Sequence, residues 1–297
     1  MAAVKPAPFT YRRAATLGEA VDLLAADPDA KVIAGGQSLV PMLNMRLARP
    51  GTLVDIGALS ALDYVDVVAG RLEVGATATQ ADVAAHPLVR AHLPVLAAAI
   101  ARIGHSQIRN RGTVCGSIAH HDPSAELPAV ALALDAEILA FGPRGPVSYA
   151  AASFFTGTFD TALAADEIVT AVQFPLPAPA TGWAFAEVAR RSGDFALVGC
   201  VALLRTDAAG TVEEARLALF GVASTPVRLP EAEDLLTGRP ATAEAFEEAA
   251  RVAAEHLDPG SDSHASADYR REVAAHLVAT TLADAFARTP AGSTADA

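Results

Sequence analysis

The sequence has 297 residues, 52% hydrophobic and 19% charged, an ordinary globular composition that can bury a sizeable core in two domains. Its formal net charge of −12 argues against a nucleic-acid backbone or an anionic membrane as partner, because either would repel the chain overall. The two cysteines, Cys115 and Cys200, are too few for a disulfide framework, a four-cysteine iron–sulfur site or a thiolate zinc cage. Any metal centre is therefore expected in another chain.

The N-terminal residues 1–13 lack the unbroken apolar core of a signal peptide. No later segment approaches the roughly 20 apolar residues that a membrane-spanning helix needs. We therefore expect a cytoplasmic protein without a membrane span.

The first part of the chain reads as a small unit of strands and a helix. Thr16 and Glu19 have the spacing of a capping box, which predicts a helix from Leu17 to Ala26. Apolar runs at residues 31–33 and 52–57 each lead into glycine and predict strands. The first is followed by "AGGQS" at residues 34–38. Two adjacent residues without Cβ let the backbone turn sharply and approach a ligand with its N–H groups, although a purely structural turn is commoner.

The next part of the chain predicts a second unit with strands at residues 71–79, 135–142 and 166–174 and a helix at 92–104. Between them, Thr113, Cys115, Gly116 and Ser117 predict a turn of small residues that can receive phosphate oxygens. Neither this turn nor "AGGQS" matches the Gly-x-Gly-x-x-Gly fingerprint or the Walker A loop, and each is weak alone. Together they suit the two phosphates of a dinucleotide.

Proline and glycine are concentrated at residues 175–182, which is the best candidate for a domain boundary. Strands are expected beyond it at 183–190, 196–205 and 214–223, and helices at 243–257 and 269–288. The predicted organisation is a first domain over 1–176, with subdomains of about 1–58 and 59–176, then a domain over 177–289 and a flexible tail over 290–297.

Four stretches occur in order over almost the whole chain: "AGGQSL", "IRNRGTVCGSIAHHDPSAELPA", "ARRSGDFALV" and "GVASTPVR". This combination resembles the FAD-binding medium subunit of the molybdenum hydroxylases, the family of carbon monoxide dehydrogenase and xanthine dehydrogenase. The resemblance implies an α+β fold. A two-subdomain FAD-binding fold of the PCMH type is expected first, followed by a C-terminal antiparallel sheet with helices, similar to carbon monoxide dehydrogenase flavoproteins.

The resemblance also implies where FAD would be held. Residues 34–38 would wrap the pyrophosphate with main-chain N–H groups, Thr113 to Ser117 would form the second pyrophosphate loop, and Asp122 would approach the adenosine. In the family, the positions of Ile103 and Ile168 pack on the flavin or adenine, and the position of Phe195 covers the isoalloxazine. Without the family, core packing would be the better interpretation of each of these three residues. No catalytic residue and no metal ligand is expected in this chain. The expected cofactor-binding residues are Val32, Ile33, Ala34, Gly35, Gly36, Gln37, Ser38, Leu39, Ile103, Thr113, Cys115, Gly116, Ser117, Asp122, Ile168 and Phe195.

Two residues depart from the family pattern. Cys115 stands where a glycine is usual, so we expect a negative φ or backbone strain there, and a buried, inert thiol. Glu187 stands where several relatives carry a lysine that reaches the flavin. A carboxylate near the ring would lower the flavin potential, but we favour a side chain turned to solvent.

No nucleophile with a base and no pair of catalytic carboxylates is evident, so we expect the substrate chemistry to occur in another subunit. The resemblance implies a large molybdenum-cofactor subunit and a small subunit with [2Fe–2S] clusters, assembled as a dimer of heterotrimers. FAD in this chain would pass electrons from the clusters to an external acceptor. Two alternatives stay open: a stand-alone FAD oxidase or dehydrogenase with Asp194 or Glu187 as its base, and a non-catalytic assembly subunit that has lost FAD.

Overall fold

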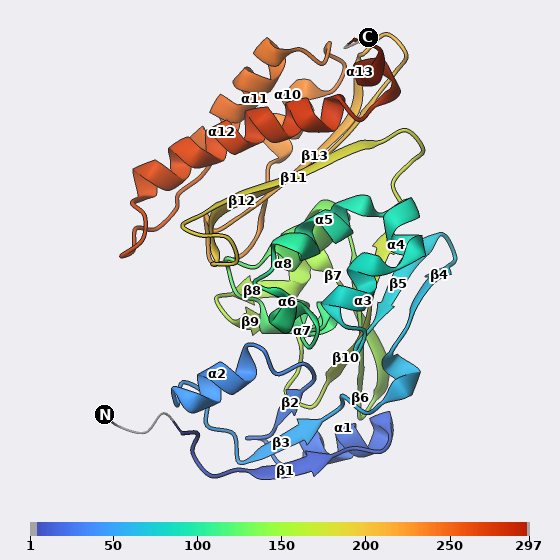
Figure 1. Ribbon diagram of the computed structural model, residues 1–297, viewed down its shortest axis with the longest axis vertical. Helices are drawn as coiled ribbons and strands as arrows, with labels where there is room; N and C mark the ends of the chain where they lie inside the picture. The colour runs from blue at the N-terminus through green and yellow to red at the C-terminus, as the bar shows by residue number, and fades with distance from the viewer. Residues whose placement is uncertain (1–4, 296–297) are drawn as a thin grey trace.

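The computed structural model describes residues 5–295 of the chain. Three units are stacked along the long axis of the molecule, with the N-terminal unit at the bottom of Figure 1 and the C-terminal unit at the top. In the N-terminal unit, three parallel strands are arranged in the order β1-β3-β2. Its elements are β1 (Thr10–Arg13), α1 (Leu17–Ala26), β2 (Lys31–Ile33), α2 (Leu39–Asn44) and β3 (Thr52–Asp55).

Helix α1 confirms the predicted helix from Leu17 to Ala26. The Oγ1 of Thr16 accepts a hydrogen bond from the N–H of Glu19 at 3.1 Å, and the Glu19 carboxylate accepts one from the N–H of Ala15 at 2.7 Å. These two bonds satisfy N–H groups that the start of a helix leaves without partners.

The middle unit contains a five-stranded antiparallel sheet in the order β4-β5-β10-β6-β7. Strand β10, which comes last in the chain among the five strands of this sheet, therefore occupies its centre. Its apolar side chains are buried on both faces. The strands are β4 (Val65–Val68), β5 (Arg71–Gly75), β6 (Glu137–Gly142), β7 (Gly145–Ala150) and β10 (Ile168–Pro175), with a separate hairpin of β8 (Phe155–Gly157) and β9 (Asp160–Thr161).

The helices of the middle unit are η1 (Ser60–Leu62), α3 (Gln80–Ala85), α4 (Pro87–His92), α5 (Pro94–Arg102), α6 (Ser106–Arg109), α7 (Val114–His120), α8 (Glu126–Ala133) and α9 (Ala151–Phe154). Of these, α5 and α8 lie between the sheet and the C-terminal unit (Figure 1). All eight residues of α8 are buried, because it packs against α5 and α7 on one side and against β12 and β13 of the next unit on the other.

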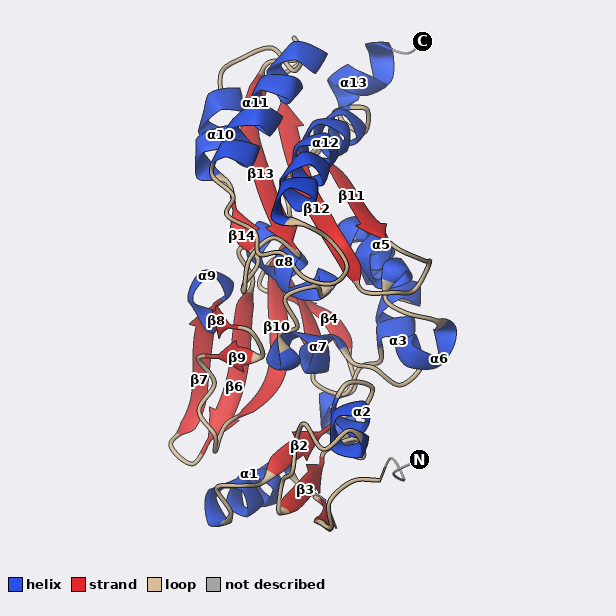
Figure 2. Ribbon diagram, turned by 90° about the vertical axis from the view of Figure 1, so that its left-hand side faces the viewer, coloured by secondary structure: helices blue, strands red, loops and turns tan. Residues whose placement is uncertain are grey.

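The C-terminal unit is a four-stranded antiparallel sheet in the order β11-β12-β13-β14, with helices over its outer face (Figure 2). Alternate side chains of β12 enter two different cores. Val201 and Leu203 face the middle unit, whereas Val198 and Cys200 face the helices. The elements are β11 (Gly182–Ala189), β12 (Ala196–Thr206), β13 (Val212–Phe220), β14 (Val227–Arg228), α10 (Pro230–Leu236), α11 (Ala243–Glu255), α12 (Ala267–Phe286) and α13 (Pro290–Ala295).

The expected flexible tail over residues 290–297 includes a short helix. Residues Pro290–Ala295 form α13, and the last two residues of the expected tail lie outside the described residues. The backbone of Gly292 lies so close to that of Phe286 that a Cβ at this position would overlap its carbonyl oxygen. The backbone of α13 is therefore closely packed against the end of α12.

The proposed domain boundary at 175–182 falls between the end of β10 and the start of β11. Among the described residues, no helix combines the length and the apolar character that crossing a membrane requires.

Candidate functional site

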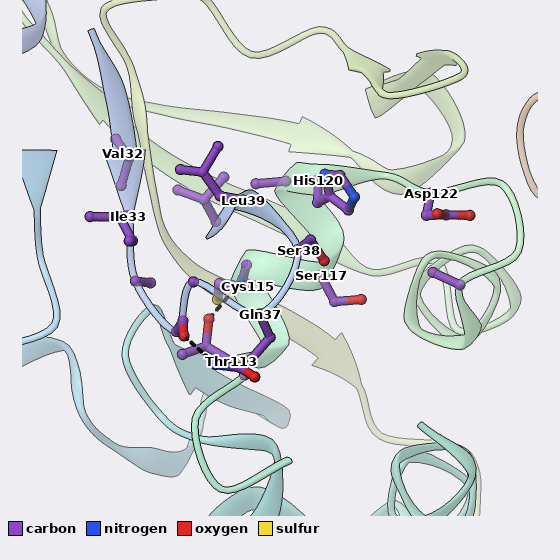
Figure 3. Close-up of a pocket in the computed structure, with 18 of the residues that line it drawn as sticks. Val32, Ile33, Gln37, Ser38, Leu39, Thr113, Cys115, Ser117, His120 and Asp122 are labelled. Carbon is purple, nitrogen blue, oxygen red and sulfur yellow. Dashed lines mark hydrogen bonds between the residues drawn. The ribbon is translucent and has the colours of Figure 1, made fainter. Parts of the chain in front are cut away.

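A cleft of about 610 Å³ lies where the three units meet. All of the cofactor-binding residues expected from the sequence line it, from Val32 on β2 to Phe195 on the loop between β11 and β12. Figure 3 shows how side chains from the N-terminal unit and from α7 surround this space. The structure thus brings together segments that lie far apart in the sequence.

The first segment of the cleft is the stretch between β2 and α2. Within the described structure, the N–H groups from Gly35 to Leu39 donate no hydrogen bond, and Ser38 makes no side-chain capping bond to α2. The Gln37 side-chain amide donates to the carbonyl of Gly35 at 2.9 Å and so stabilises the turn. The result is a row of main-chain donors facing a cavity, an arrangement that suits anionic oxygens.

The second segment is the first turn of α7, which corrects the expected turn at Thr113 to Ser117. Thr113 is the N-cap, and its Oγ1 accepts a hydrogen bond from the N–H of Gly116 at 2.9 Å. In the described structure, the N–H groups of Val114 and Cys115 have no main-chain acceptor. This end of α7 therefore also presents donors to the cleft.

The first segment is in direct contact with the residues that lead into the second. A Cβ on Gly35 would overlap the carbonyl oxygen of Arg111 and lie 2.8 Å from the Cα of Gly112. Gly36 has a φ of +71°, in the region that side-chain-bearing residues rarely adopt. The glycine pair thus serves two purposes, since the first residue allows the two segments to touch and the second allows the sharp turn.

Apolar side chains form the remaining walls. Ile168 at the start of β10 is 2% exposed, and Ile103 follows α5. The Nη1 of Arg109 donates to the carbonyls of Ile103 and Gly104, at 2.8 and 3.0 Å, so this guanidinium holds the wall in place. Phe195, by contrast, is 65% exposed at the edge of the cleft.

Asp122 reaches the cleft from the loop after α7 (Figure 3). Its Oδ1 accepts a hydrogen bond from the N–H of Ser124 at 2.8 Å, which fixes the carboxylate. The preceding residue, His121, has a φ of +47° and ends the helix.

The thiol of Cys115 is turned into the core, as expected. Its Sγ donates to the carbonyl of Val74 on β5 at 3.5 Å, the residue is 2% exposed, and burial raises the pKa of the thiol. Its backbone is helical, so the substitution for the usual glycine causes no strain. We conclude that Cys115 contributes its backbone, and no thiolate, to the cleft.

Sequence analysis did not anticipate Glu126, a cleft residue at the first position of α8. It is 7% exposed, and burial raises the pKa of its carboxyl group to about 8, with smaller contributions in the same direction from Glu187 and Asp122. The only signal in the sequence is its place in "SAELPAV", an acidic residue before a long apolar run.

The prediction of a solvent-facing Glu187 is wrong. Its Oε2 is buried and has no hydrogen-bond partner among the described residues, and burial raises the pKa of the carboxyl group against the opposing effect of Arg102. The Oδ2 of Asp194, which lines the cleft, is also buried without a hydrogen-bond partner there, and lies 3.9 Å from Arg190. Glu187 is close enough to Glu126 to contribute to the raised pKa of that carboxyl group.

A cleft with two sets of main-chain donors that lack acceptors and with apolar walls suits a ligand that carries both anionic oxygens and apolar groups. The family described as "FAD binding domain in molybdopterin dehydrogenase" matches residues 7–177, and the one described as "CO dehydrogenase flavoprotein C-terminal domain" matches residues 183–285.

Known proteins are similar to this chain over nearly its full length. The nicotine 6-hydroxylase medium subunit of Paenarthrobacter nicotinovorans is 40% identical over 94% of this chain and 98% of its own. The carbon monoxide dehydrogenase medium chain of Hydrogenophaga pseudoflava is 37% identical over 95% of this chain and 99% of its own.

Solved structures give the same answer. Carbon monoxide dehydrogenase from Hydrogenophaga pseudoflava, in a form lacking the Mo-pyranopterin moiety, superposes with a TM-score of 0.93 at 38% identity, over 96% of this chain and 99% of its own. Quinoline 2-oxidoreductase from Pseudomonas putida 86 gives 0.92 at 38% identity, over 97% and 99%. The chain belongs to the FAD-binding medium subunits of the molybdenum hydroxylase family, as the sequence motifs indicated. It is a flavoprotein oxidoreductase subunit with the expected α+β fold.

Proposed function

We propose that this chain holds FAD in the cleft and passes electrons from the [2Fe–2S] clusters of a partner subunit to an external acceptor. The observation that carries the proposal is the contact of Gly35 with Arg111 and Gly112, the residues that lead into α7, because it brings the two sets of main-chain donors to the same cleft. FAD supplies the redox chemistry when it is bound. The chain's own residues bind the cofactor, orient it and set the polarity around it.

The roles of the side chains follow from their positions. Residues 34–38 and the first turn of α7 would hold the phosphates through their N–H groups. Ile103, Ile168 and Phe195 would pack on the planar rings, and Asp122 would accept hydrogen bonds from the adenosine. The buried carboxyl group of Glu126, with its raised pKa, would stay largely protonated at neutral pH and so keep negative charge away from the cleft.

We further propose that the chain works in a dimer of heterotrimers with a large molybdenum-cofactor subunit and a small [2Fe–2S] subunit. The names of its relatives, medium subunit and medium chain, support a multi-subunit assembly. A cytoplasmic location is part of the proposal and fits the free thiols of Cys115 and Cys200.

The test begins with the chain purified together with whatever binds it. Acid precipitation should release FAD into the supernatant, because the cleft supplies non-covalent contacts. Flavin retained in the pellet would contradict the non-covalent site, and FMN would contradict the dinucleotide. A colourless protein that does not take up added FAD would support the assembly subunit without a cofactor.

The isolated, FAD-loaded chain should then be mixed anaerobically with aldehydes, purines and N-heterocycles. We expect no bleaching of the flavin absorbance, but reoxidation by an acceptor dye after reduction with dithionite. Bleaching by a substrate at ~1 s⁻¹ or faster, the lower end of ordinary turnover, would favour the stand-alone flavoenzyme. Co-purification of a large and a small partner chain would favour the electron-transfer subunit.

A further inference from the structure

Phe159 occupies a backbone position that disfavours it. It is the second residue of the two-residue loop between β8 and β9, and its φ is +56°. Turns with a positive φ at this place prefer glycine or asparagine, because a Cβ there is crowded by the backbone. The side chain is 51% exposed, so burial does not explain the choice of phenylalanine either.

Several contacts hold this loop in its strained shape. The N–H of Phe159 donates to the carbonyl of His121 at 3.1 Å, and the Nδ1 of His121 lies 3.0 Å from the carbonyl of Asp160. His121 is itself fully buried at a positive φ of +47°. Phe159 and His121, which both have an unfavourable positive φ, are thus joined by a main-chain hydrogen bond. Backbone strain of this kind is often found where the placement of a side chain matters.

The ring of Phe159 is paired with that of His120. Their centroids are 5.0 Å apart at an interplanar angle of 31°, and both residues line the cleft. Burial lowers the pKa of His120, so its imidazole is neutral at pH 7 and can lie under another ring without a charge to be solvated. The pair forms an aromatic surface on one wall of the cleft, and its exposed member is Phe159.

The cleft has a second exposed aromatic side chain, Phe195, on the loop between β11 and β12. FAD has two planar ring systems, adenine and isoalloxazine. One exposed phenylalanine on each of two separate elements therefore matches a ligand with two flat ends joined by phosphates.

We propose that Phe159, supported by His120, is a platform on which one of the two planar rings of FAD stacks. The inference rests on the proposed FAD site and adds a residue outside the family motifs. The strained turn is maintained because it aims this side chain at the cofactor.

The test uses the purified full chain stripped of flavin and titrated with FAD, with binding followed by flavin fluorescence. Stacking of a base on an aromatic side chain contributes about 1–3 kcal/mol, so Phe159→Ala and Phe159→Gly should raise the Kd for FAD roughly 5- to 150-fold. Phe159→Trp should restore tight binding. Titration with ADP and with FMN identifies the ring, since only the ligand that carries the stacked ring should lose affinity.

Two controls separate stacking from strain and from surface effects. Ala69 is exposed, lies outside the cleft and has a φ of +49°. Ala69→Gly and Phe159→Gly should both leave the Tm of the apo chain unchanged or higher, whereas only Phe159→Gly should weaken FAD binding. Phe9→Ala removes another exposed phenylalanine, outside the cleft, and should leave the Kd unchanged.

An unchanged Kd for FAD in Phe159→Ala would overturn the inference. The same holds if that variant binds FAD normally but loses partner subunits on purification, which would make Phe159 an interface residue. Failure of the unsubstituted chain to bind FAD would instead contradict the proposed function itself, so the two failures are distinguishable.

Discussion

At the scale of single residues, Gly35 and Gly36 are adjacent but answer to different constraints. A side chain at Gly35 would push the two donor-bearing segments apart, because it would meet the main chain of Arg111 and Gly112. At Gly36 the added Cβ would meet only side chains, those of Ile33 and Val40 at 3.2 Å, but the φ of +71° would be unfavourable. The first glycine is required by tertiary packing and the second by local conformation.

We therefore expect Gly35→Ala to lose FAD and to lower the free energy of unfolding by about 1–3 kcal/mol, the usual cost of overpacking. Gly260→Ala is the matched control, because nothing lies within 4 Å of its Cβ position. FAD per chain after gel filtration and urea unfolding measure the two effects. Equal flavin content in the two variants would mean that contact between the segments does not matter for the cofactor.

Gly36→Ala should cost about 1–2 kcal/mol of stability from its positive φ and also reduce FAD content. Gly70→Ala controls for the first effect, since Gly70 has a φ of +78° and open space around it. We expect the two variants to lose a similar amount of stability, but only Gly36→Ala to lose FAD. Loss of FAD in neither variant would show that "AGGQS" is only a structural turn.

The raised pKa of Glu126 predicts how the free energy of unfolding depends on pH. Its pKa is raised from its usual range to about 8 in the folded chain, so folding favours its protonated form. This contribution to stability is fully present below the unfolded pKa and is lost as the pH rises through the folded value. Glu126→Gln removes the dependence, so its free energy of unfolding relative to the unsubstituted chain should rise by a few kcal/mol between pH 5 and pH 9.

Urea unfolding across that pH range measures the effect. Glu247→Gln on the exposed face of α11 is the control, and its difference from the unsubstituted chain should stay flat. A flat difference for Glu126→Gln as well would mean that its carboxyl group titrates normally in the folded state.

Sequence reasoning found the cleft residues whose backbone matters, but not the acidic residues whose burial matters. The reason is that "AGGQS" is a local motif, legible over a few neighbours in the chain. Whether Glu126 turns inward depends on how α8 packs against β12 and β13, and whether Glu187 does so depends on how β11 packs against α5. No local pattern specifies either contact. Phe159 was not predicted for the same reason, because only the fold brings its ring next to that of His120.

At the scale of elements, Arg228 joins the C-terminal unit to the end of α8. Its guanidinium makes two hydrogen bonds of 2.8 Å to Glu233 on α10 and one of 3.1 Å to Asp135, the residue that follows the cap of α8. Its Nη1 also donates to the carbonyl of Leu132 at 3.3 Å. The side chains of Arg228 and Glu233 are 24% and 12% exposed, so the pair is partly shielded from water.

Arg228→Met should lower the free energy of unfolding by about 1–3 kcal/mol, because Glu233 would keep its charge without its main partner. Arg251→Met is the control, since the Arg251–Glu255 pair is more than half exposed on both sides and should change stability by less than about 0.5 kcal/mol. Urea unfolding compares them. Equal effects would show that the link between the units is no stronger than a surface ion pair.

Elements themselves were largely predictable, and their arrangement was not. Helix α1 was predicted from its cap to its last residue, because capping is a local effect. The position of β10 between β5 and β6 depends on pairing with strands far back in the chain, for which periodicity gives no register. The short helix α13 was not predicted, because its backbone packs against the end of α12, and no local pattern specifies that contact.

At the scale of the whole molecule, the relatives that match this chain over nearly its full length are themselves a medium subunit and a medium chain of larger enzymes. The resemblance found in the motifs covered fold and cofactor correctly, because those properties are shared by the whole family. The partner subunits and the route of the electrons stay proposals, and co-purification is their first test.

The cleft takes its walls from all three units, from Val32 through Thr113 to Phe195. A ligand that fills it ties the whole chain to its folded form, and by mass action adds about 2.7 kcal/mol when its concentration is 100 times Kd. If that ligand is FAD as proposed, the lifetime of newly made chains would depend on the flavin supply of the cell. Chains that lack the cofactor would be the preferred targets of proteases, and the abundance of this subunit would follow the supply of flavin.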